Sequence, residues 1–260
     1  MEKPKLLVAK IGGNVIEDKK VLDSFLEDFS KLEGYKILIH GGGKSATQLA
    51  EKLGVKTEMI DGRRITSVDN LDIVVMTYAG LLNKTIVSVL QNYNCNALGL
   101  TGADANIILA KKRPKQFVDY GYVGDIDKVN NKVLKIFLEQ NMIPVFCAIT
   151  HDGNGVLLNT NADTVASEIA SAMSVDYEVS LYYCFELKGV LENIEDKESV
   201  IEHINLEKYE QLRDKEIIAD GMLPKLQNCF DALQKKVNKV HIANAEFVKN
   251  NTIKHTTLSL

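Results

Sequence analysis

Two glycine-rich turns contain the residues of this sequence that are best placed to do chemistry. His40-Gly41-Gly42-Gly43 ends an apolar run that begins at Tyr35, and Lys10-Ile11-Gly12-Gly13 ends another that begins at Leu6. Glycine lets the backbone turn sharply, and successive N–H groups in such a turn form a concave anion site. A helix that begins at the turn adds positive potential. Two such turns, one of them with a lysine, predict a phosphate group held from two sides. The structural alternative is two tight strand-to-helix turns.

The ending Gly43-Lys44-Ser45 is similar to the end of a nucleotide-binding P-loop, whose pattern is Gly-x-x-x-x-Gly-Lys-Ser/Thr. The first glycine of that pattern would stand at position 38, which is Leu38, inside the apolar run. A turn of three glycines is also too short to wrap around a β-phosphate. The spacing therefore excludes a P-loop.

Three polar segments add candidate residues, and each also has a purely structural explanation. They are residues 159–163, 61–66 and 220–225. Asn161 and Asp163 fit the cap and the first turn of a helix. The arginines of the second segment fit a solvated turn, and Lys225 fits a surface lysine in a helix that Pro224 opens.

Composition limits the classes of function. The chain has 260 residues, 45% of them hydrophobic, which is enough for a sizeable core. Its formal net charge of -4, without a dense run of Lys or Arg, argues against nucleic acid as a partner. The sequence contains no run of 18 apolar residues, so no membrane span is expected. The first five residues lead directly into a strand too short for a signal-peptide core.

Cysteine and histidine usage predicts neither disulfides nor a metal site. The four cysteines are scattered, without a Cys-x-x-Cys pair, and the five histidines lack ligand spacing. We therefore expect a reduced, cytoplasmic compartment and no metal bound directly by protein ligands.

Apolar runs of strand length alternate with helical patterns, which predicts an α/β fold. Strands are expected over residues 6–10, 35–40, 96–100, 143–149, 177–183 and 239–243. Helices are expected over residues 19–32, 44–52, 68–92, 133–140, 162–173 and 223–235. Residues 107–135 are expected to be irregular, with short hairpins around Gly121 and Gly124. Nearly continuous apolar strands indicate a mostly parallel sheet covered on both faces. A weak change in composition near residues 155–161 places a boundary between two lobes, 1–155 and 156–260.

Taken together and in this order, five motifs resemble those of the amino acid kinase family. They are Lys10-x-Gly12-Gly13, His40-Gly41-Gly42-Gly43, Gly62-x-Arg64-x-Thr66, Asn159-x-Asn161-Ala162-Asp163 and Asp220-Gly221-Met222-x-x-Lys225. Each motif is weak alone, but five in order over nearly the whole chain are specific. The third and fourth together are similar to the branch that acts on acetylglutamate, rather than to aspartate, uridylate or carbamate kinases.

The resemblance implies a three-layer αβα sandwich around a central, mainly parallel sheet, the carbamate kinase-like fold. It assigns acyl-amino acid binding and dimerisation to residues 1–155, and ATP binding to residues 156–260. The implied reaction moves the γ-phosphoryl of ATP to the side-chain carboxylate of N-acetyl-L-glutamate. The product is an acyl phosphate of arginine biosynthesis, made by a cytoplasmic homodimer. Mg²⁺ is expected on the ATP phosphates, mostly surrounded by water.

The same resemblance implies a role for each motif residue. Lys10 would bridge the transferred phosphoryl group and the β-phosphate, Lys225 would approach from the ATP side, and Asp163 would hold the two lysines. The glycines expected at the phosphoryl oxygens are Gly12, Gly13, Gly42 and Gly43. An ionised carboxylate needs no general base, so the reaction requires positioning and charge neutralisation.

The substrate side is implied in the same way. Arg64 would bind the α-carboxylate of the acyl-amino acid in fork geometry, which lysine does less well. Asn159 would help to orient that substrate, together with Gly42 and Gly43.

Two departures from the family pattern concern the nucleotide side. Relatives commonly carry Thr/Ser-Asp-Val before the glycine that matches Gly189, whereas this chain has Phe185-Glu186-Leu187 near that point. Glu186 would stand where an aspartate usually meets the nucleotide ribose, with Leu187 next to it. The Gly-Thr that relatives carry near the C-terminus is also missing around Thr256.

Alternatives remain for the activity. The acceptor could be another N-acylglutamate, such as N-succinylglutamate, or a related carboxylate or carbamate. A ligand sensor without catalytic activity is an alternative from another functional class. The presence of Lys10, Asp163 and Lys225 argues against it, because a sensor has no need for residues that bind a transferred phosphoryl group. Arginine-regulated relatives carry an additional N-terminal helix that links dimers into a hexamer. Only five residues precede the first expected strand here, so arginine inhibition is not expected.

Overall fold

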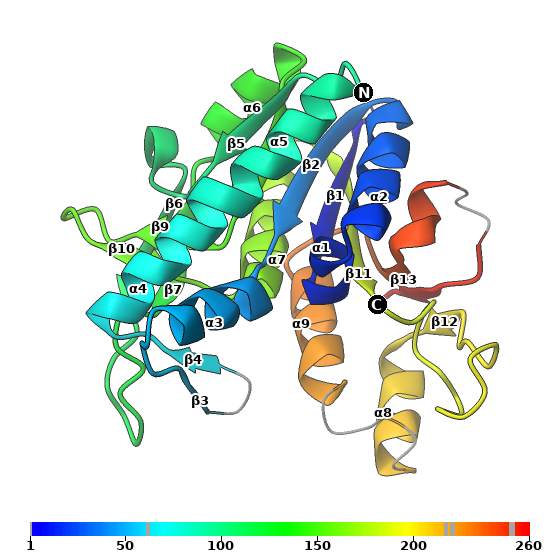
Figure 1. Ribbon diagram of the computed structural model, residues 1–260. Helices are drawn as coiled ribbons and strands as arrows, with labels where there is room; N and C mark the ends of the chain where they lie inside the picture. The colour runs from blue at the N-terminus through cyan, green and yellow to red at the C-terminus, as the bar shows by residue number, and fades with distance from the viewer. Residues whose placement is uncertain (1, 61–62, 216–217, 219–221, 250–252) are drawn as a thin grey trace. The chain divides into compact units, whose positions relative to one another are not determined.

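The computed structural model describes residues 2–60, 63–215, 218, 222–249 and 253–260 (Figure 1). Asp61, Gly62, Asp220 and Gly221, which belong to two of the expected motifs, lie outside the described residues. The chain forms two compact units. The first contains residues 1–36 and 166–260, and the second contains residues 37–165. The N-terminal strand and helices therefore pack with the C-terminal part of the chain. The assignment of binding roles to lobes 1–155 and 156–260 stays a prediction.

The sheet of the first unit has a parallel centre. Its strands run in the order β12 (His203–Ile204), β14 (Thr256–Leu258), β13 (Lys239–Asn244), β11 (Glu178–Phe185) and β1 (Lys5–Ile11). The pairs β1–β11 and β11–β13 are parallel, while β13–β14 is antiparallel. Val8, Leu181 and Val240 are fully buried, as expected for strands covered on both faces.

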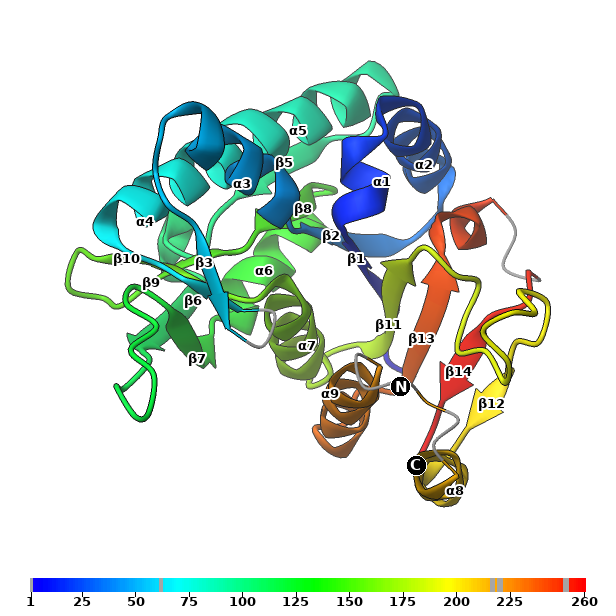
Figure 2. The same ribbon diagram turned by 60° about the horizontal axis from the view of Figure 1, so that its bottom comes forward.

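Helices cover both faces of this sheet (Figure 2). They are α1 (Gly13–Glu17), α2 (Lys19–Lys31), α8 (Leu206–Asp214), α9 (Leu223–Gln234) and the 3₁₀ turn η3 (Ala245–Val248). Helix α2 begins where the Asp18 carboxylate accepts from the N–H groups of Lys20 and Val21. Phe25 and Phe29 lie one turn apart on the buried face of α2, and their rings are 5.8 Å apart.

The described residues of the second unit form three sets of paired strands. Strands β2 (Tyr35–His40), β8 (Ile143–Cys147) and β5 (Ala97–Leu100) are parallel neighbours in this order. A second sheet has the order β10 (Leu157–Asn159), β9 (Ile149–His151), β6 (Ile108–Lys112) and β7 (Gly124–Val129). The third is the hairpin β3 (Glu58–Ile60) and β4 (Arg63–Ile65).

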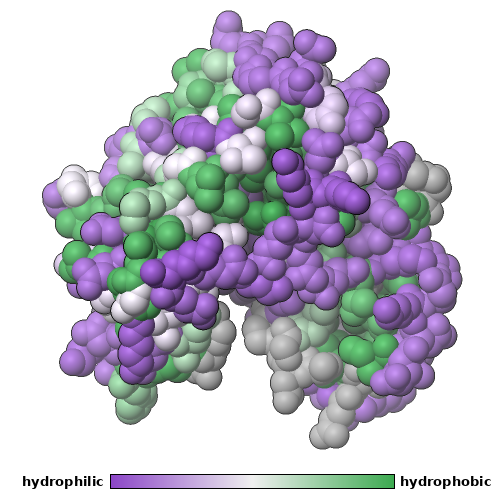
Figure 3. Space-filling model, viewed as in Figure 1, coloured by the Kyte–Doolittle hydropathy of each residue, from purple (hydrophilic) through white to green (hydrophobic). Residues whose placement is uncertain are grey.

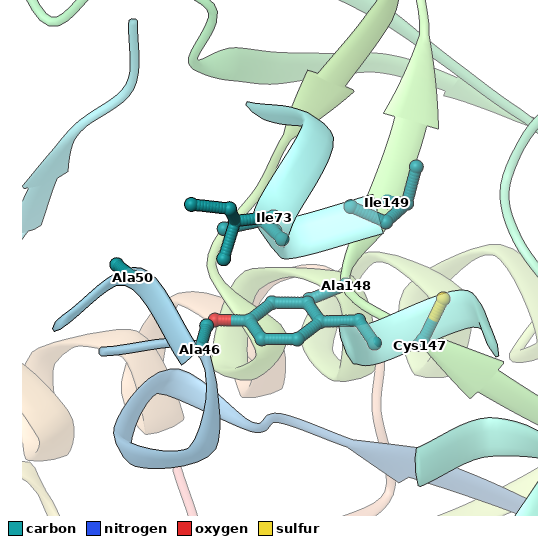
Figure 4. Close-up of a cluster of buried hydrophobic side chains, with 8 residues drawn as sticks. Ala46, Ala50, Ile73, Cys147, Ala148 and Ile149 are labelled. Carbon is teal, nitrogen blue, oxygen red and sulfur yellow. The ribbon is translucent and has the colours of Figure 1, made fainter. Parts of the chain in front are cut away.

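The helical segments of the second unit are α3 (Gly43–Lys52), α4 (Val68–Val75), the π-helical turn η1 (Met76–Leu82), α5 (Asn83–Asn92), the 3₁₀ turn η2 (Asp104–Asn106) and α6 (Asn131–Glu139). They follow one of these strands or, for η1 and α5, continue the helix before them. Helix α7 (Ala162–Met173) begins in the second unit and ends in the first. A buried cluster joins α3 and α4 to the end of β8 and the start of β9, with Ala46, Ile73 and Cys147 among its members (Figure 4).

The continuous helical stretch Val68–Asn92 is long and apolar enough, by length and composition alone, to cross a membrane. Leu71, Val74 and Ile86 are nevertheless buried inside the second unit. Asn83, in the middle of the stretch, makes buried hydrogen bonds to its neighbours. These contacts identify the stretch as a core helix, with some exposed hydrophobic residues on its outer side (Figure 3).

Most of the expected elements are confirmed, and the differences have local causes. The strand expected over residues 143–149 ends at Cys147, because Ile149 already pairs in the other sheet as part of β9. The irregular region 107–135 contains the antiparallel pair β6–β7. Gly121 lies outside that pair and instead bridges to Thr66.

Candidate active site

Lys10 and Gly12 form a compact corner in the first unit, where β1 ends and α1 begins. The Lys10 side chain is 8% exposed. A Cβ atom placed on Gly12 would lie 3.2 Å from the Lys10 ammonium nitrogen. The ammonium group therefore lies directly over the Gly12 backbone, and a side chain at Gly12 would press on it.

Lys225 reaches the same region from the first turn of α9. Its ammonium nitrogen lies over the ring of Phe185, 4.2 Å from the ring centroid. The ammonium nitrogen of Lys10 lies over the same ring at 5.5 Å. The structure therefore brings together the two lysines that the sequence assigned to the phosphoryl group, and an aromatic ring that it did not.

A cavity opens beside Phe185 in the first unit, with a volume of about 990 Å³. Its lining includes Asn14, Lys20, Phe185, Glu186 and Asn244. This volume is sufficient for a ligand of nucleotide size. Glu186, expected at the nucleotide, is thus part of a cavity wall. Leu187 follows it in the bend after β11.

The triple-glycine turn of the second unit has a backbone that requires glycine at its centre. Gly42 has φ 155° and ψ 17° and is the N-cap of α3. A Cβ atom there would lie 2.4 Å from a methyl group of Leu82 and 2.9 Å from the Tyr78 ring. Gly43 is the first residue of α3, so the backbone N–H groups of this turn lie at a helix N-terminus, where anions are favoured.

His40 holds the first peptide of this turn. Its Nδ1 is 2.8 Å from the Gly41 carbonyl oxygen, and its Nε2 is 3.1 Å from the side-chain nitrogen of Asn83. Burial lowers the pKa of His40 to about 4, so the ring is neutral near pH 7. His40 is therefore a fixed part of the turn rather than a proton carrier at that pH.

Arg64 is buried beside the same turn. Its Nη2 donates to the Gly43 carbonyl oxygen at 2.9 Å and to the Thr47 hydroxyl at 2.8 Å. Its Nη1 donates to the Thr57 hydroxyl at 3.1 Å. The two hydrogens on Nη2 therefore have acceptors, so a carboxylate that binds as a fork must displace one of them. Thr47 and Thr57 were missed from the sequence because their role depends on this packing.

Asn159 and Asp163 belong to the segment that leads into α7. Asn159 donates to the Thr66 hydroxyl at 3.0 Å, which joins it to the residue that follows β4. Asn161 accepts from the N–H groups of Asp163 and Thr164, at 2.7 and 3.2 Å, and so confirms its expected role as a helix cap. Asp163 lies in the first turn of α7, where the helix dipole favours a carboxylate.

Two groups of expected residues are thus assembled. The first unit joins Lys10, Gly12 and Lys225 around Phe185. The second joins Gly43 to Arg64 directly, and Asn159 to Thr66. Among the described residues, no group of three or more His, Cys, Asp and Glu side chains is placed to hold a metal ion.

Comparison with known proteins identifies the family. Residues 5–244 match the sequence model of the Amino acid kinase family. The chain belongs to the amino acid kinase family. A protein from Cytophaga hutchinsonii named acetylglutamate kinase is 54% identical over 243 residues, which cover 93% of this chain and 92% of that protein. One of the same name from Phocaeicola vulgatus is 48% identical over 246 residues, 95% of this chain and 96% of that protein.

Solved structures support the same fold. Carbamate kinase from Giardia lamblia bound to AMP-PNP has a TM-score of 0.70 at 16% identity, covering 99% of this chain and 98% of that one. The fold class is therefore confirmed as α/β, a three-layer αβα sandwich with a mainly parallel central sheet. As an amino acid kinase, the chain is an enzyme that uses ATP and a small-molecule acceptor.

Proposed function

We propose that this amino acid kinase transfers the γ-phosphoryl group of ATP to the side-chain carboxylate of N-acetyl-L-glutamate. The product is an acyl phosphate that serves arginine biosynthesis. Relatives named acetylglutamate kinase, 54% and 48% identical over nearly the full length, support this acceptor. The single observation that carries the proposal is the hydrogen bond from Arg64 to the Gly43 carbonyl, 2.9 Å long. Because the bond holds a buried cation beside the turn proposed to bind phosphate, it supports an acceptor with a carboxylate.

The reaction needs charge neutralisation more than proton transfer. A carboxylate oxygen of the acceptor attacks the γ-phosphorus, and the bond to the β,γ-bridging oxygen breaks as ADP leaves with its electron pair. The acceptor carboxylate is ionised at neutral pH and needs no general base. The obstacle is repulsion between an anion and a polyanion, which fixed cations and N–H donors reduce.

We assign the lysines and glycines to that task. Lys10 bridges the transferred phosphoryl group and the β-phosphate, and Lys225 neutralises charge from the ATP side. Backbone N–H groups of Gly12, Gly13, Gly42 and Gly43 donate to the phosphoryl oxygens.

We assign Asp163 to hold these lysines and to orient the water around Mg²⁺. Mg²⁺ bound to the ATP phosphates supplies further charge neutralisation. Because ATP phosphates and water provide most of its ligands, the chain needs no cluster of metal-binding side chains.

The remaining residues select the two substrates. Arg64 binds the α-carboxylate of the acyl-amino acid, and Asn159 orients the same molecule. Glu186 and Leu187 lie at the nucleotide, and Glu186 lines the 990 Å³ cavity of the first unit. We place acyl-amino acid binding in residues 1–155 and ATP binding in residues 156–260.

The proposed assembly is a cytoplasmic homodimer that forms through the acyl-amino acid lobe. Hydrophobic side chains exposed along the helical stretch of the second unit support a protein contact there. Val68, Met76 and Leu81 are 55%, 51% and 64% exposed. Burial of such side chains against a second copy would stabilise the pair.

A coupled assay of ADP release tests the proposal. Purified protein is given ATP and Mg²⁺ with N-acetyl-L-glutamate, N-succinyl-L-glutamate, glutamate, aspartate, UMP or carbamate. We expect turnover with N-acetyl-L-glutamate, and hydroxylamine should trap the product as a hydroxamate. Turnover on another acceptor, with none on any N-acylglutamate, would refute the assignment. Preference for the succinyl compound would correct the acyl group only.

A further inference from the structure

The ring of Phe185 lies beneath both lysine ammonium groups of the first unit. The nitrogen of Lys225 is 4.2 Å from the ring centroid, and that of Lys10 is 5.5 Å from it. We propose that Phe185 is a positioning residue, whose ring holds the ammonium groups of Lys10 and Lys225 ready for the phosphates of ATP. This inference rests on the proposed function, which assigns both lysines to those phosphates.

The strand register explains how the ring reaches this position. Lys10 on β1 is paired with Tyr183 on β11, so the two side chains share one face of the sheet. Phe185 lies two residues beyond Tyr183 and therefore projects from the same face. The rings of Tyr183 and Phe185 are 6.2 Å apart and nearly parallel, with an interplanar angle of 18°. Tyr183 is 2% exposed and gives Phe185 a buried support.

The position of Lys225 is electrostatically unfavourable without such a partner. Lys225 lies in the first turn of α9, where the helix dipole disfavours a cation. That turn carries no acidic residue. Within the part of the chain that the structure describes, Lys225 makes no ion pair. The second ammonium group at the same ring adds repulsion between like charges.

An aromatic ring can help Asp163 to hold the two ammonium groups without adding the negative charge of a second carboxylate. The negative face of the ring attracts an ammonium group, although the ring carries no net charge. It therefore does not repel an incoming polyphosphate. An ammonium group has three N–H donors, and contact with the ring on one side leaves donors on the other sides for phosphate oxygens. Holding the lysines in place before ATP arrives reduces the entropy lost on binding.

Residue 185 also stands out in the sequence. The family resemblance implies Thr/Ser and Asp where this chain has Phe185 and Glu186, so the ring departs from that implied pattern at the nucleotide side. Its position at the end of an apolar strand makes it look like a core residue. Only the contacts with Lys10 and Lys225 distinguish it from one.

The test compares Phe185→Leu, which keeps an apolar side chain but removes the ring, with Phe185→Tyr, which keeps the ring. Calorimetry measures the Kd of MgATP and of MgADP without acceptor. Phe185→Leu should raise both Kd values by about 3- to 30-fold, the range expected for a lost cation–π contact. Phe185→Tyr should restore affinity to within about twofold of the original chain.

A matched control separates this role from general stability. Phe29 lies in α2 of the same unit, and its ring contacts the ammonium group of Lys36 at 5.3 Å. Phe29→Leu removes a cation–π contact away from the lysines of the site. It should lower the thermal midpoint and leave the Kd of MgATP unchanged. Phe185→Leu should instead raise the Kd of MgATP and leave the thermal midpoint nearly unchanged.

A second readout needs no nucleotide. Protein labelled with ¹³C at the lysine ε-carbon gives one resonance per lysine, and Lys10→Arg and Lys225→Arg assign the two of interest. The ring current of Phe185 should shift both resonances upfield. Phe185→Leu should return them to ordinary positions, and Phe185→Tyr should not. Unchanged resonances or an unchanged Kd in Phe185→Leu would overturn the inference.

The outcomes distinguish this inference from the proposed function. If N-acetyl-L-glutamate is not phosphorylated but the Kd and resonance changes occur, the acceptor is wrong and the role of Phe185 stands. If N-acetyl-L-glutamate is phosphorylated but the Kd and resonance changes do not occur, the acceptor is right and the proposed role of Phe185 is wrong.

Discussion

Asn83 donates from its side-chain nitrogen to Nε2 of His40 over 3.1 Å. The same nitrogen donates to the Val145 carbonyl at 2.9 Å, which fixes the orientation of the amide because a carbonyl can only accept. Nε2 of His40 therefore accepts, and the ring proton lies on Nδ1. Nδ1–H donates to the Gly41 carbonyl at 2.8 Å. In a trans peptide this turns the N–H of Gly42 away from His40.

Asn83→Leu should therefore impair the glycine turn without touching substrate. It leaves Nε2 of His40 without a donor and no longer selects the Nδ1–H tautomer. We expect kcat to fall about tenfold, as for one lost buried hydrogen bond that orders a site. Steady-state kinetics with ATP and N-acetyl-L-glutamate measure this. Gln91→Met is the control, because Gln91 lies on the same helix and donates to the Ala97 carbonyl at 3.0 Å. Equal kcat in both variants would show that the hydrogen bond from Asn83 to His40 does not support the glycine turn.

The buried His40 should make stability depend on pH. Its pKa is lowered by burial to about 4, whereas an unfolded histidine titrates near its ordinary pKa of 6.5. Between these values the unfolded chain binds more protons, so the free energy of unfolding should fall as pH falls from about 6.5 to 4. The shift sets an upper limit of about 3 kcal/mol for this loss. Denaturant unfolding measured across this pH range tests the effect.

His40→Gln supplies the comparison for that pH series. The variant cannot titrate at position 40, so it should lose less stability than the original chain as the pH falls. The difference between the two should be greatest above pH 6.5 and shrink toward pH 4. His241, whose pKa burial and the neighbouring His255 lower to about 3, contributes in the same direction to both chains. A constant difference across the series would contradict the prediction.

Residue types and spacing predicted the regular parts of this molecule. Strand β2 and helix α7 begin and end where their patterns predict. Helix α8 was missed because it is rich in charge and buries only Tyr209 and Leu212. The hairpin β3–β4 was missed because its strands have three residues each.

The candidate site divides in the same way. Lys10 was singled out as the lysine of a glycine-rich turn, and Arg64 through a motif that resembles the amino acid kinase family. Phe185 and Tyr78 look like core residues in apolar segments, and their contacts with Lys225 and Gly42 come from residues distant in the chain. Tertiary packing determines such roles, and a single sequence does not contain it as a local pattern.

Gly42→Ala should destabilise the protein and abolish most activity. The residue has φ 155°, and an added Cβ would meet Leu82 at 2.4 Å and Tyr78 at 2.9 Å. Backbone strain and overpacking each cost about 1–3 kcal/mol. Gly54→Ala is the matched control, because Gly54 has φ 71° and no atom within 4 Å of an added Cβ. Thermal unfolding of both variants isolates the clash from the strain. A fall in thermal midpoint no larger than that of Gly54→Ala would show that the turn at Gly42 tolerates a side chain.

Lys10→Ala and Lys225→Ala should each lower kcat by about 10²–10³, with little change in thermal midpoint. Both lysines are proposed to neutralise charge that develops as the phosphoryl group moves. Asp163→Asn should also lose most activity, with a smaller effect on binding. Lys132→Ala, at an exposed position of α6, is the control. A lysine variant with nearly unchanged kcat would place that residue away from the phosphoryl group.

Arg64→Lys should raise the KM for the acyl-amino acid far more than the KM for ATP. Lysine keeps the charge but loses the planar fork that binds a carboxylate through two N–H groups. It also cannot reproduce all three donations that Arg64 makes to Gly43, Thr47 and Thr57. We expect a rise of about tenfold or more in the KM for N-acetyl-L-glutamate, as for one lost charge-assisted contact. The neighbouring exposed residue offers the control Arg63→Lys, which should leave both KM values unchanged. Equal changes in both KM values for Arg64→Lys would move Arg64 out of the substrate site and leave it a support for the α3 N-terminus.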